Sequence, residues 1–169
     1  MSNEAGVWWL RHGVPLPHHG ANENTTETVF DYEDGERRFK IHSWRPNDLP
    51  GKSSPAVIMF HGGGWMIGNI SMHRRFYSNI AHHLNMVVIS PEYTLSPDAG
   101  VPLAAYADCM ATIKYVHDNA NQFRIDPERI VLSGDSAGGQ LTLATGLNAR
   151  VELGVDIKDC RCRKIDNRF

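Results

Sequence analysis

The sequence predicts an α/β fold in which helices flank a mostly parallel sheet. Three apolar runs of strand length, residues 56–60, 86–90 and 130–134, alternate along the chain with segments of helical periodicity. A continuous apolar run indicates a strand that is buried on both faces, which is typical of parallel sheets. Strands that alternate with amphipathic helices build layered α/β folds. We therefore expect one α/β domain with a central sheet.

The composition is that of a globular chain long enough for one ordinary domain. Of 169 residues, 41% are hydrophobic and 21% are charged, which separates the sequence from disordered chains. The net charge of −2 and the pI near 6.5 give no electrostatic basis for binding nucleic acid or a membrane surface. The apolar runs are too short to cross a bilayer, and the N-terminus does not resemble a signal peptide. These features predict a cytoplasmic location.

The N-terminal part of the chain is predicted to contribute an arm and two strands. Residues 1–28 are polar and rich in turn formers, so we expect a loose arm or a cap segment there. Residues 28–32 and 37–46 have strand-like composition, with a turn between them at Glu33–Gly35. The α/β domain is accordingly predicted to span residues 29–150.

Three segments between and after the buried strands have the features of helices. In the first, Phe76, Ile80 and Leu84 are four residues apart, which is the spacing of a helix. The second is expected to open at Pro102, because proline is favoured in the first helical turn. Its predicted apolar stripe consists of Leu103, Tyr106, Met110, Ile113 and Val116. The third is expected over residues 136–150.

The periodic pattern stops after the third helix. Residues 151–169 have a charged end and weak periodicity, so they are predicted to be an unpatterned tail. The domain would then be truncated directly after this helix. Because no further strand is expected, residues 130–134 would form an apolar edge of the sheet, which invites aggregation.

The cysteines predict neither a disulfide framework nor a metal site. There are three, Cys109, Cys160 and Cys162, and an odd number is typical of a reducing compartment. Cys160 and Cys162 have the spacing of half a metal site, but no second Cys/His pair follows them. We therefore expect no metal and no cofactor.

The stretch Gly134–Gly138, with the sequence GDSAG, carries the strongest chemical signal. It follows a predicted strand and opens a predicted helix, which is the context of a nucleophile elbow. Glycines two residues before and after Ser136 keep Cβ atoms away from the neighbouring strand and helix. The alternative is a turn of small residues without chemistry, but the flanking strand and helix favour a nucleophilic serine.

A second glycine-rich stretch, His61–Trp65, stands at the end of the predicted strand 56–60. Consecutive glycines let main-chain N–H groups face a negative oxygen, which makes an oxyanion hole. The usual second donor is the N–H group of the residue after the nucleophile, here Ala137. A phosphate-binding loop is disfavoured, because neither the Gly-Lys-Ser/Thr ending nor the G-x-G-x-x-G pattern occurs.

The segments HGGGW, EYTLSP and GDSAGG, in this order and at this spacing, identify a family. They resemble the hormone-sensitive-lipase-like branch of the α/β-hydrolases, which includes arylacetamide deacetylase-like esterases and bacterial family IV carboxylesterases. The resemblance covers residues 38–148. Family members usually have Arg and Ala where this chain has Thr94 and Ser96.

The resemblance implies an α/β-hydrolase fold and a serine carboxylic-ester hydrolase that acts on a small apolar ester or amide. It implies that Ser136 is the nucleophile that forms an acyl-enzyme. The site residues that it implies besides Ser136 are the oxyanion donors Gly63, Gly64 and Ala137, and the supporting residues His61, Gly62 and Asp135. Kynurenine formamidase-like activity is a narrower alternative, which Gly64 disfavours because that family often has a bulky residue there.

The sequence departs from the family in its histidines. The family's triad acid and histidine follow the serine. After Ser136 there are Asp156, Asp159 and Asp166, but all nine histidines precede it. The earlier histidines His73, His82, His83 and His117 are poor substitutes, because they are predicted on or beside helices that flank the sheet.

Two hypotheses about function follow. The first is a carboxylesterase-type chain that is inactive or weakly active because the triad acid and histidine are missing. The second is a non-catalytic remnant that binds a ligand or a partner subunit. Arg11–Gly13 also resembles the Arg-His-Gly signature of histidine phosphatases, but only over three residues, so a surface loop is favoured. The oligomeric state is left open.

Overall fold

The computed structural model describes residues 20–163 apart from 36, 52 and 97–102, and its strands form a six-stranded sheet in the order β1-β2-β4-β3-β5-β6. The strands are β1 (Thr25–Asp34), β2 (Arg37–Pro46), β3 (Ser54–Phe60), β4 (Val87–Pro91), β5 (Ile125–Asp135) and β6 (Asp159–Arg163). β1, β2 and β4 pair antiparallel, whereas β4, β3, β5 and β6 run parallel. The predicted α/β fold with a mostly parallel sheet is confirmed.

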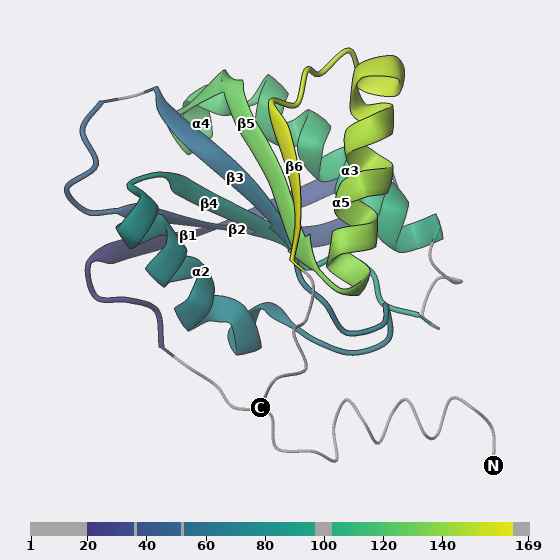
Figure 1. Cartoon of the computed structure of the whole chain (residues 1–169), viewed down its shortest axis with the longest axis horizontal. Helices are drawn as coiled ribbons and strands as arrows, with labels where there is room; N and C mark the ends of the chain where they lie inside the picture. The colour runs from purple at the N-terminus through teal and green to yellow at the C-terminus, as the bar shows by residue number, and fades with distance from the viewer. Residues whose placement is uncertain (1–19, 36, 52, 97–102, 164–169) are drawn as a thin grey trace.

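Helices cover both faces of this sheet (Figure 1). They are α2 (Ile70–Leu84), α3 (Leu103–Asp118), α4 (Ala120–Phe123) and α5 (Ala137–Asn148), followed by one π-helical turn, η1 (Ala149–Leu153). Helix α2 lies on one face, and α3 and α5 lie on the other (Figure 1). None of the helices in the described ranges is both long enough and apolar enough to cross a bilayer.

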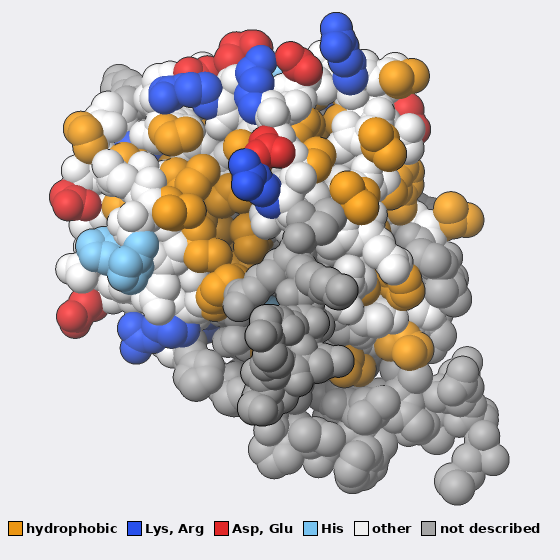
Figure 2. All heavy atoms as spheres, viewed as in Figure 1, with side chains coloured by type: hydrophobic (Ala, Val, Ile, Leu, Met, Phe, Trp, Pro, Cys, Tyr) orange, Lys and Arg blue, Asp and Glu red, His pale blue; other side chains and the backbone are white. Residues whose placement is uncertain are grey.

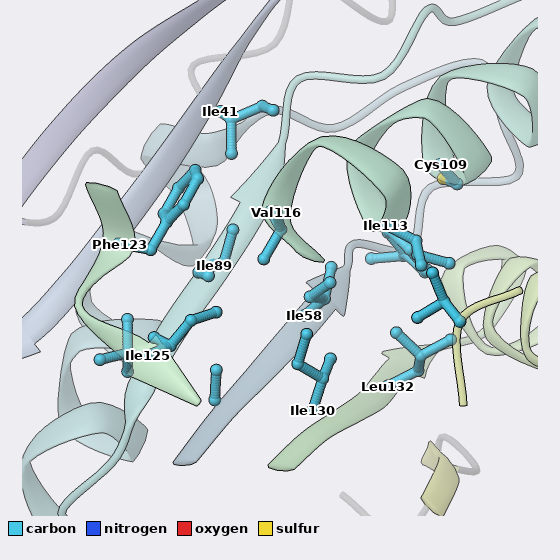
Figure 3. Close-up of a cluster of buried hydrophobic side chains, with 14 of the residues drawn as sticks. Ile41, Ile58, Ile89, Cys109, Ile113, Val116, Phe123, Ile125, Ile130 and Leu132 are labelled. Atoms are coloured by element: carbon cyan, nitrogen blue, oxygen red, sulfur yellow. The ribbon is translucent and has the colours of Figure 1, made fainter. Parts of the chain in front are cut away.

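The core lies on both faces of the central strands, as the continuous apolar runs predict. Side chains alternate along a strand, so Ile58 and Phe60 of β3 pack on the α3 side, while Val57 and Met59 pack under α2. Figure 3 shows Ile58, Ile89, Ile130 and Leu132 converging with side chains of α3. Strands β3 and β4 are thus buried on both faces, whereas β5 is buried on the α3 side and half-buried at Val131 on the α2 side.

Strand β6 corrects the prediction that residues 151–169 are an unpatterned tail. It pairs in parallel with β5, from Val131 opposite Asp159 to Asp135 opposite Arg163. The prediction that β5 forms the edge of the sheet is therefore wrong over the described residues. The sequence DCRCR of β6 contains no apolar run that would predict a strand. The strand forms because its main chain pairs with that of β5. A short, charged strand is how many proteins protect the edge of a sheet.

Two further expectations are also wrong. Strand β1 begins at Thr25, inside the segment 1–28 that was predicted to be an arm, because its polar side chains are supported by the full ladder to β2. In α2 the buried residues are Ile70, Tyr77, Ser78 and Ala81. Phe76, Ile80 and Leu84, whose spacing predicted this helix, lie beside that face, and Leu84 is 64% exposed. In α3, Leu103 is exposed as well, and Pro102 lies outside the described residues.

Candidate active site

Ser136 occupies a sharp turn between β5 and α5. β5 ends at Asp135 and α5 begins at Ala137, so the serine is the single residue between them. Its φ of 51° and ψ of −118° lie in a region that residues other than glycine seldom adopt. The side chain is exposed and makes no capping hydrogen bond to α5. The hydroxyl is therefore free of the helix that it precedes, which is the geometry predicted for a nucleophile elbow.

The two glycines that flank the turn are required by close packing. A Cβ atom at Gly138 would overlap the carbonyl oxygen of Phe60, the last residue of β3. A Cβ atom at Gly134 would overlap the carbonyl oxygen of Gly138. The turn thus lies directly against the end of β3, and larger residues at these two positions would push it away.

The glycine loop after β3 turns sharply at Gly63 and Gly64, which have φ values of 132° and 61°. The carbonyl oxygen of Gly63 accepts hydrogen bonds from the N–H groups of Met66, at 3.1 Å, and Ile67, at 3.0 Å. A Cβ atom at Gly63 would overlap the carbonyl group of Ile67, whereas Gly64 has open space around it. Gly63 is therefore demanded by packing and backbone conformation, and Gly64 by conformation alone.

Asp135 joins the glycine loop to the serine turn. β3 and β5 are parallel neighbours with Phe60 opposite Gly134, so the residues that follow both strands meet at one edge of the sheet. There the N–H group of Gly62 donates to Oδ1 of Asp135 at 3.1 Å. Ala137, whose N–H group is a predicted oxyanion donor, is buried next to this junction. The structure therefore brings the start of the glycine loop, His61 and Gly62, against the turn that contains Ser136.

His61 is buried, with 1% of its surface exposed. Its ring stacks on Tyr93 with a centroid distance of 4.3 Å, and the Tyr93 hydroxyl donates to the His61 carbonyl oxygen at 2.6 Å. Burial lowers the pKa of His61 from 6.5 to about 4, so the ring is neutral at pH 7. A buried ring that contacts its own loop, bonding at Nδ1 to the carbonyl oxygen of Gly62, supports the loop rather than the chemistry.

The four histidines that precede Ser136 and were considered as substitutes for the triad histidine lie at different distances from the serine turn. His73, on the first turns of α2, lines a groove together with Ser133, Gly134 and Asp135, directly before Ser136. Burial lowers the pKa of His73, while the charge of Asp135 acts in the opposite direction. His82 and His83 lie at the other end of α2. His117 lies at the end of α3, where its Nδ1 is 3.2 Å from the Asp118 carboxylate.

This groove, between α2 and β6, has a volume of about 780 Å³. Its apolar lining includes Val57, Met59, Ile80, Leu84, Met86 and Val131, and Asp159 and Arg161 lie at its rim. Figure 2 shows hydrophobic side chains gathered in this hollow. Phe76, Ile80 and Leu84 of α2 therefore line an open groove that reaches the serine turn.

The carboxylates after Ser136 have other partners. Asp156 pairs with Lys158, and Asp159 pairs with Arg161. Asp166 and Arg11–Gly13 lie outside the described residues. Within the described ranges no group of three or more His, Cys, Asp or Glu side chains is placed to hold a metal ion. Cys160 lies half-buried on β6.

The supporting function of the loop Glu92–Ser96 was missed by sequence reasoning, which used this stretch only as a family marker. The N–H group of Ser96 donates to the carbonyl oxygen of Trp65 at 2.7 Å, so the loop is bonded to the glycine loop. The loop Glu92–Ser96 is in turn held by Asp108, whose carboxylate accepts a hydrogen bond from the Thr94 N–H group at 2.8 Å. The signal was available, because a segment that directly follows a buried parallel strand must lie at the same edge as the glycine loop.

A parallel α/β sheet with a strained serine between strand and helix, next to a glycine loop, defines the class of α/β hydrolases. Residues 57–160 match the family model described as alpha/beta hydrolase fold. Because this match covers more than half of the chain, the chain belongs to the α/β-hydrolase fold family.

Three similar proteins extend this assignment. An arylesterase of Saccharolobus solfataricus is 34% identical over 126 residues, which is 75% of this chain and 40% of the relative. Lipase 2 of Moraxella sp. (strain TA144) is 31% identical over 128 residues, 72% of this chain and 29% of the relative. The solved structure of a hyperthermophilic esterase from Pyrobaculum calidifontis superposes with a TM-score of 0.73 and 29% identity, covering 92% of this chain and 47% of that one. The chain spans less than half the length of these relatives.

Proposed function

We propose that this chain carries the nucleophile and oxyanion hole of a serine carboxylic-ester hydrolase whose substrate is a small, uncharged, apolar ester or amide. The observation that carries the proposal is Ser136. It is held in a strained conformation, exposed, and tied through Asp135 to the glycine loop. Strain of this kind at an exposed serine is costly and is typical of functional sites. The arylesterase and lipase relatives support ester hydrolysis in particular.

In the proposed reaction the Ser136 Oγ atom attacks the carbonyl carbon of the ester and gives up its proton to a base. The carbonyl oxygen becomes negative, and the N–H groups of Gly63, Gly64 and Ala137 stabilise it. Each such donor is typically worth about 10²–10³ in rate. The alkoxide leaves as the alcohol after it takes up a proton, and water then hydrolyses the acyl-enzyme and restores Ser136. The chemistry needs no metal or cofactor.

We identify no side chain of this chain that is well placed to act as the general base for Ser136. His61 is neutral but buried under its own loop, and the carboxylates Asp156 and Asp159 are paired with cations on the surface. Enzymes that lose triad members typically keep only about 10³–10⁴-fold catalysis over the reaction in water. We therefore propose that this chain by itself is acylated slowly and turns over weakly.

The test is reaction with a fluorophosphonate probe, which forms a covalent bond with activated serines. We expect slow labelling of the folded chain and none of Ser136→Ala, whose fold should be unchanged because the side chain is exposed. Ser133→Ala is the matched control, since Ser133 precedes the turn on β5 and should leave labelling intact. Labelling that persists in Ser136→Ala contradicts the proposal.

The second candidate function is a non-catalytic binding module, and the observation that favours it is the open apolar groove beside the turn. Complete absence of labelling in a folded, monodisperse chain, together with binding of an apolar ester analogue by calorimetry, would favour this candidate over the hydrolase.

A further inference from the structure

Four aromatic rings from three segments form a continuous stack beside the serine turn. Tyr93 stacks on His61 at 4.3 Å, His61 on His73 at 5.6 Å, and His73 on Tyr77 at 5.4 Å, measured between ring centroids. The successive interplanar angles are 18°, 20° and 18°, so the rings are nearly parallel. The stack connects the loop after β4, the glycine loop and helix α2.

The orientation of the His61 ring determines the shape of the glycine loop. Nδ1 of His61 lies 2.8 Å from the carbonyl oxygen of Gly62, so the ring is bonded to the loop itself. A Cβ atom at Gly68 would lie 2.9 Å from the same nitrogen, which shows that the far end of the loop closes over the ring. One face of His61 rests on Tyr93 and the other on His73, so His73 is the ring that holds it from the side of α2.

Asp135 faces both the glycine loop and His73. Its Oδ1 atom accepts the Gly62 N–H group at 3.1 Å, which joins the loop to the serine turn. Its carboxylate lines the same groove as His73, and its negative charge favours the protonated form of that ring. Of the other titratable groups, His61 disfavours a second positive charge, and burial raises the pKa of Tyr77 and keeps it neutral. Asp159 and Arg161 of β6 line the same groove as His73 and pair with each other.

We propose that His73 is a positioning residue of the oxyanion loop. Its neutral ring holds His61 in place within the stack, and its protonation draws the Asp135 carboxylate away from the Gly62 N–H group. The step consists of the uptake of one proton from solvent by a ring nitrogen of His73. The loop would thus be well ordered at neutral pH and loosened in mild acid. The link to oxyanion binding rests on the proposed function, but the coupling between His73 and the loop does not.

The experiment is hydrogen exchange of the peptide 61–68 at steps from pH 7 to pH 4, corrected for intrinsic exchange rates and followed by mass spectrometry. Burial lowers the pKa of His73, so in the wild type we expect protection to fall by about tenfold or more below the usual titration range of a histidine, the loss expected for one hydrogen bond to a charged acceptor. His73→Phe keeps a stacked ring without a titrating nitrogen, so it should lose less protection over the same range. His73→Ala should be less protected than the wild type already at pH 7.

The matched control is His83→Phe, since His83 lies on the same helix but is exposed and bonded to the Asn79 carbonyl oxygen at 2.7 Å. It should behave as the wild type does. A fall in protection in His73→Phe equal to that in the wild type overturns the proposal, and so does full protection in His73→Ala. If His73→Ala does not fold, the comparison of the wild type with His73→Phe decides alone.

A second measurement separates this proposal from the proposed function. If the chain reacts with the fluorophosphonate probe, labelling should decline more steeply between pH 7 and pH 4 in the wild type than in His73→Phe, because burial lowers the pKa of His73. Equal declines overturn the proposal. If neither protein is labelled, the hydrolase proposal fails, while the exchange experiment still tests whether His73 orders the loop.

Discussion

Two buried histidines of this chain, His42 and His61, have pKa values that are shifted in opposite directions. His42 on β2 lies between two carboxylates, with Nδ1 2.8 Å from Glu27 and Nε2 2.9 Å from Glu92. Burial alone would lower the pKa of His42. The hydrogen bonds that the ring makes to the carboxylates of Glu92 and Glu27 outweigh this effect, so the pKa is raised. His61 has no carboxylate within hydrogen-bonding distance, and burial lowers its pKa. The two carboxylates bonded to His42, which His61 lacks, therefore account for the opposite directions of the two pKa shifts.

The two histidines belong to one column of rings. His42 stacks on Trp44 at 5.8 Å, and Trp44 contacts Tyr77 at 5.6 Å, which is the last ring of the stack that reaches His61. One end of this column is thus ionic and lies among strands β1, β2 and β4. The other end is neutral and supports the glycine loop. The difference shows that a histidine surrounded by carboxylates from neighbouring strands has a raised pKa, whereas burial without such partners lowers it.

The largest expected effect is a loss of stability in acid, caused by His61. Its folded pKa is about 4, against 6.5 for a free histidine, so the unfolded chain binds a proton in this range that the folded chain does not. This contribution is fully present above pH 6.5 and is lost as the pH falls toward 4, by about 3 kcal/mol. Urea unfolding between pH 7 and pH 4 measures it, and NMR titration of the His61 ring should give a midpoint near 4. A midpoint near 6.5 for His61 would remove the distinction between the two histidines.

A smaller effect is expected from Glu27→Gln, which removes the charged acceptor of His42. Glu27 also pairs with Arg74 of α2 at 3.0 Å, and its side chain is mostly buried. We expect a loss of about 2 kcal/mol at pH 6, the usual size of a hydrogen bond to a charged group. The raised pKa means that the His42 contribution is full below pH 6.5 and is lost as the pH rises through the folded value. The loss should therefore be smaller at pH 9, and an equal loss at both pH values would show that His42 is neutral.

The smallest effect is expected from Glu92→Gln at the other side of His42. The Glu92 side chain is 47% exposed, so solvent screens its interaction. We expect a loss of less than about 1 kcal/mol in the same urea experiment. Asp118→Asn, which breaks the exposed pair with Lys114, serves as a baseline near zero. A loss as large as that of Glu27→Gln would show that both carboxylates share the charge of His42 equally.

The fold and the serine turn could be predicted from the sequence because their signals are local. The apolar runs of β3, β4 and β5 are continuous, and the Gly134–Gly138 pattern specifies its own backbone geometry. The glycine loop was predictable for the same reason. In each case the residues that carry the signal are neighbours in the chain.

The features that were missed depend on contacts between distant segments. β6 has no apolar pattern that would predict a strand. It is held by main-chain bonds to β5, and these do not depend on side-chain type. Glu27, His42 and Glu92 come from three separate stretches, and Glu27 lies in the segment that was predicted to be an arm. The stripe Phe76, Ile80 and Leu84 has perfect helical spacing, but spacing alone cannot tell the core from a neighbouring groove.

The conformation of Ser136 has a consequence for how the chain can change over evolutionary time. Its φ of 51° suits glycine, which would adopt it with less strain. At this position the most stabilising replacement is therefore also one that removes the hydroxyl. Selection for stability alone would therefore favour replacement of Ser136 by glycine. A serine that is retained in this conformation among related sequences would indicate selection for its hydroxyl oxygen.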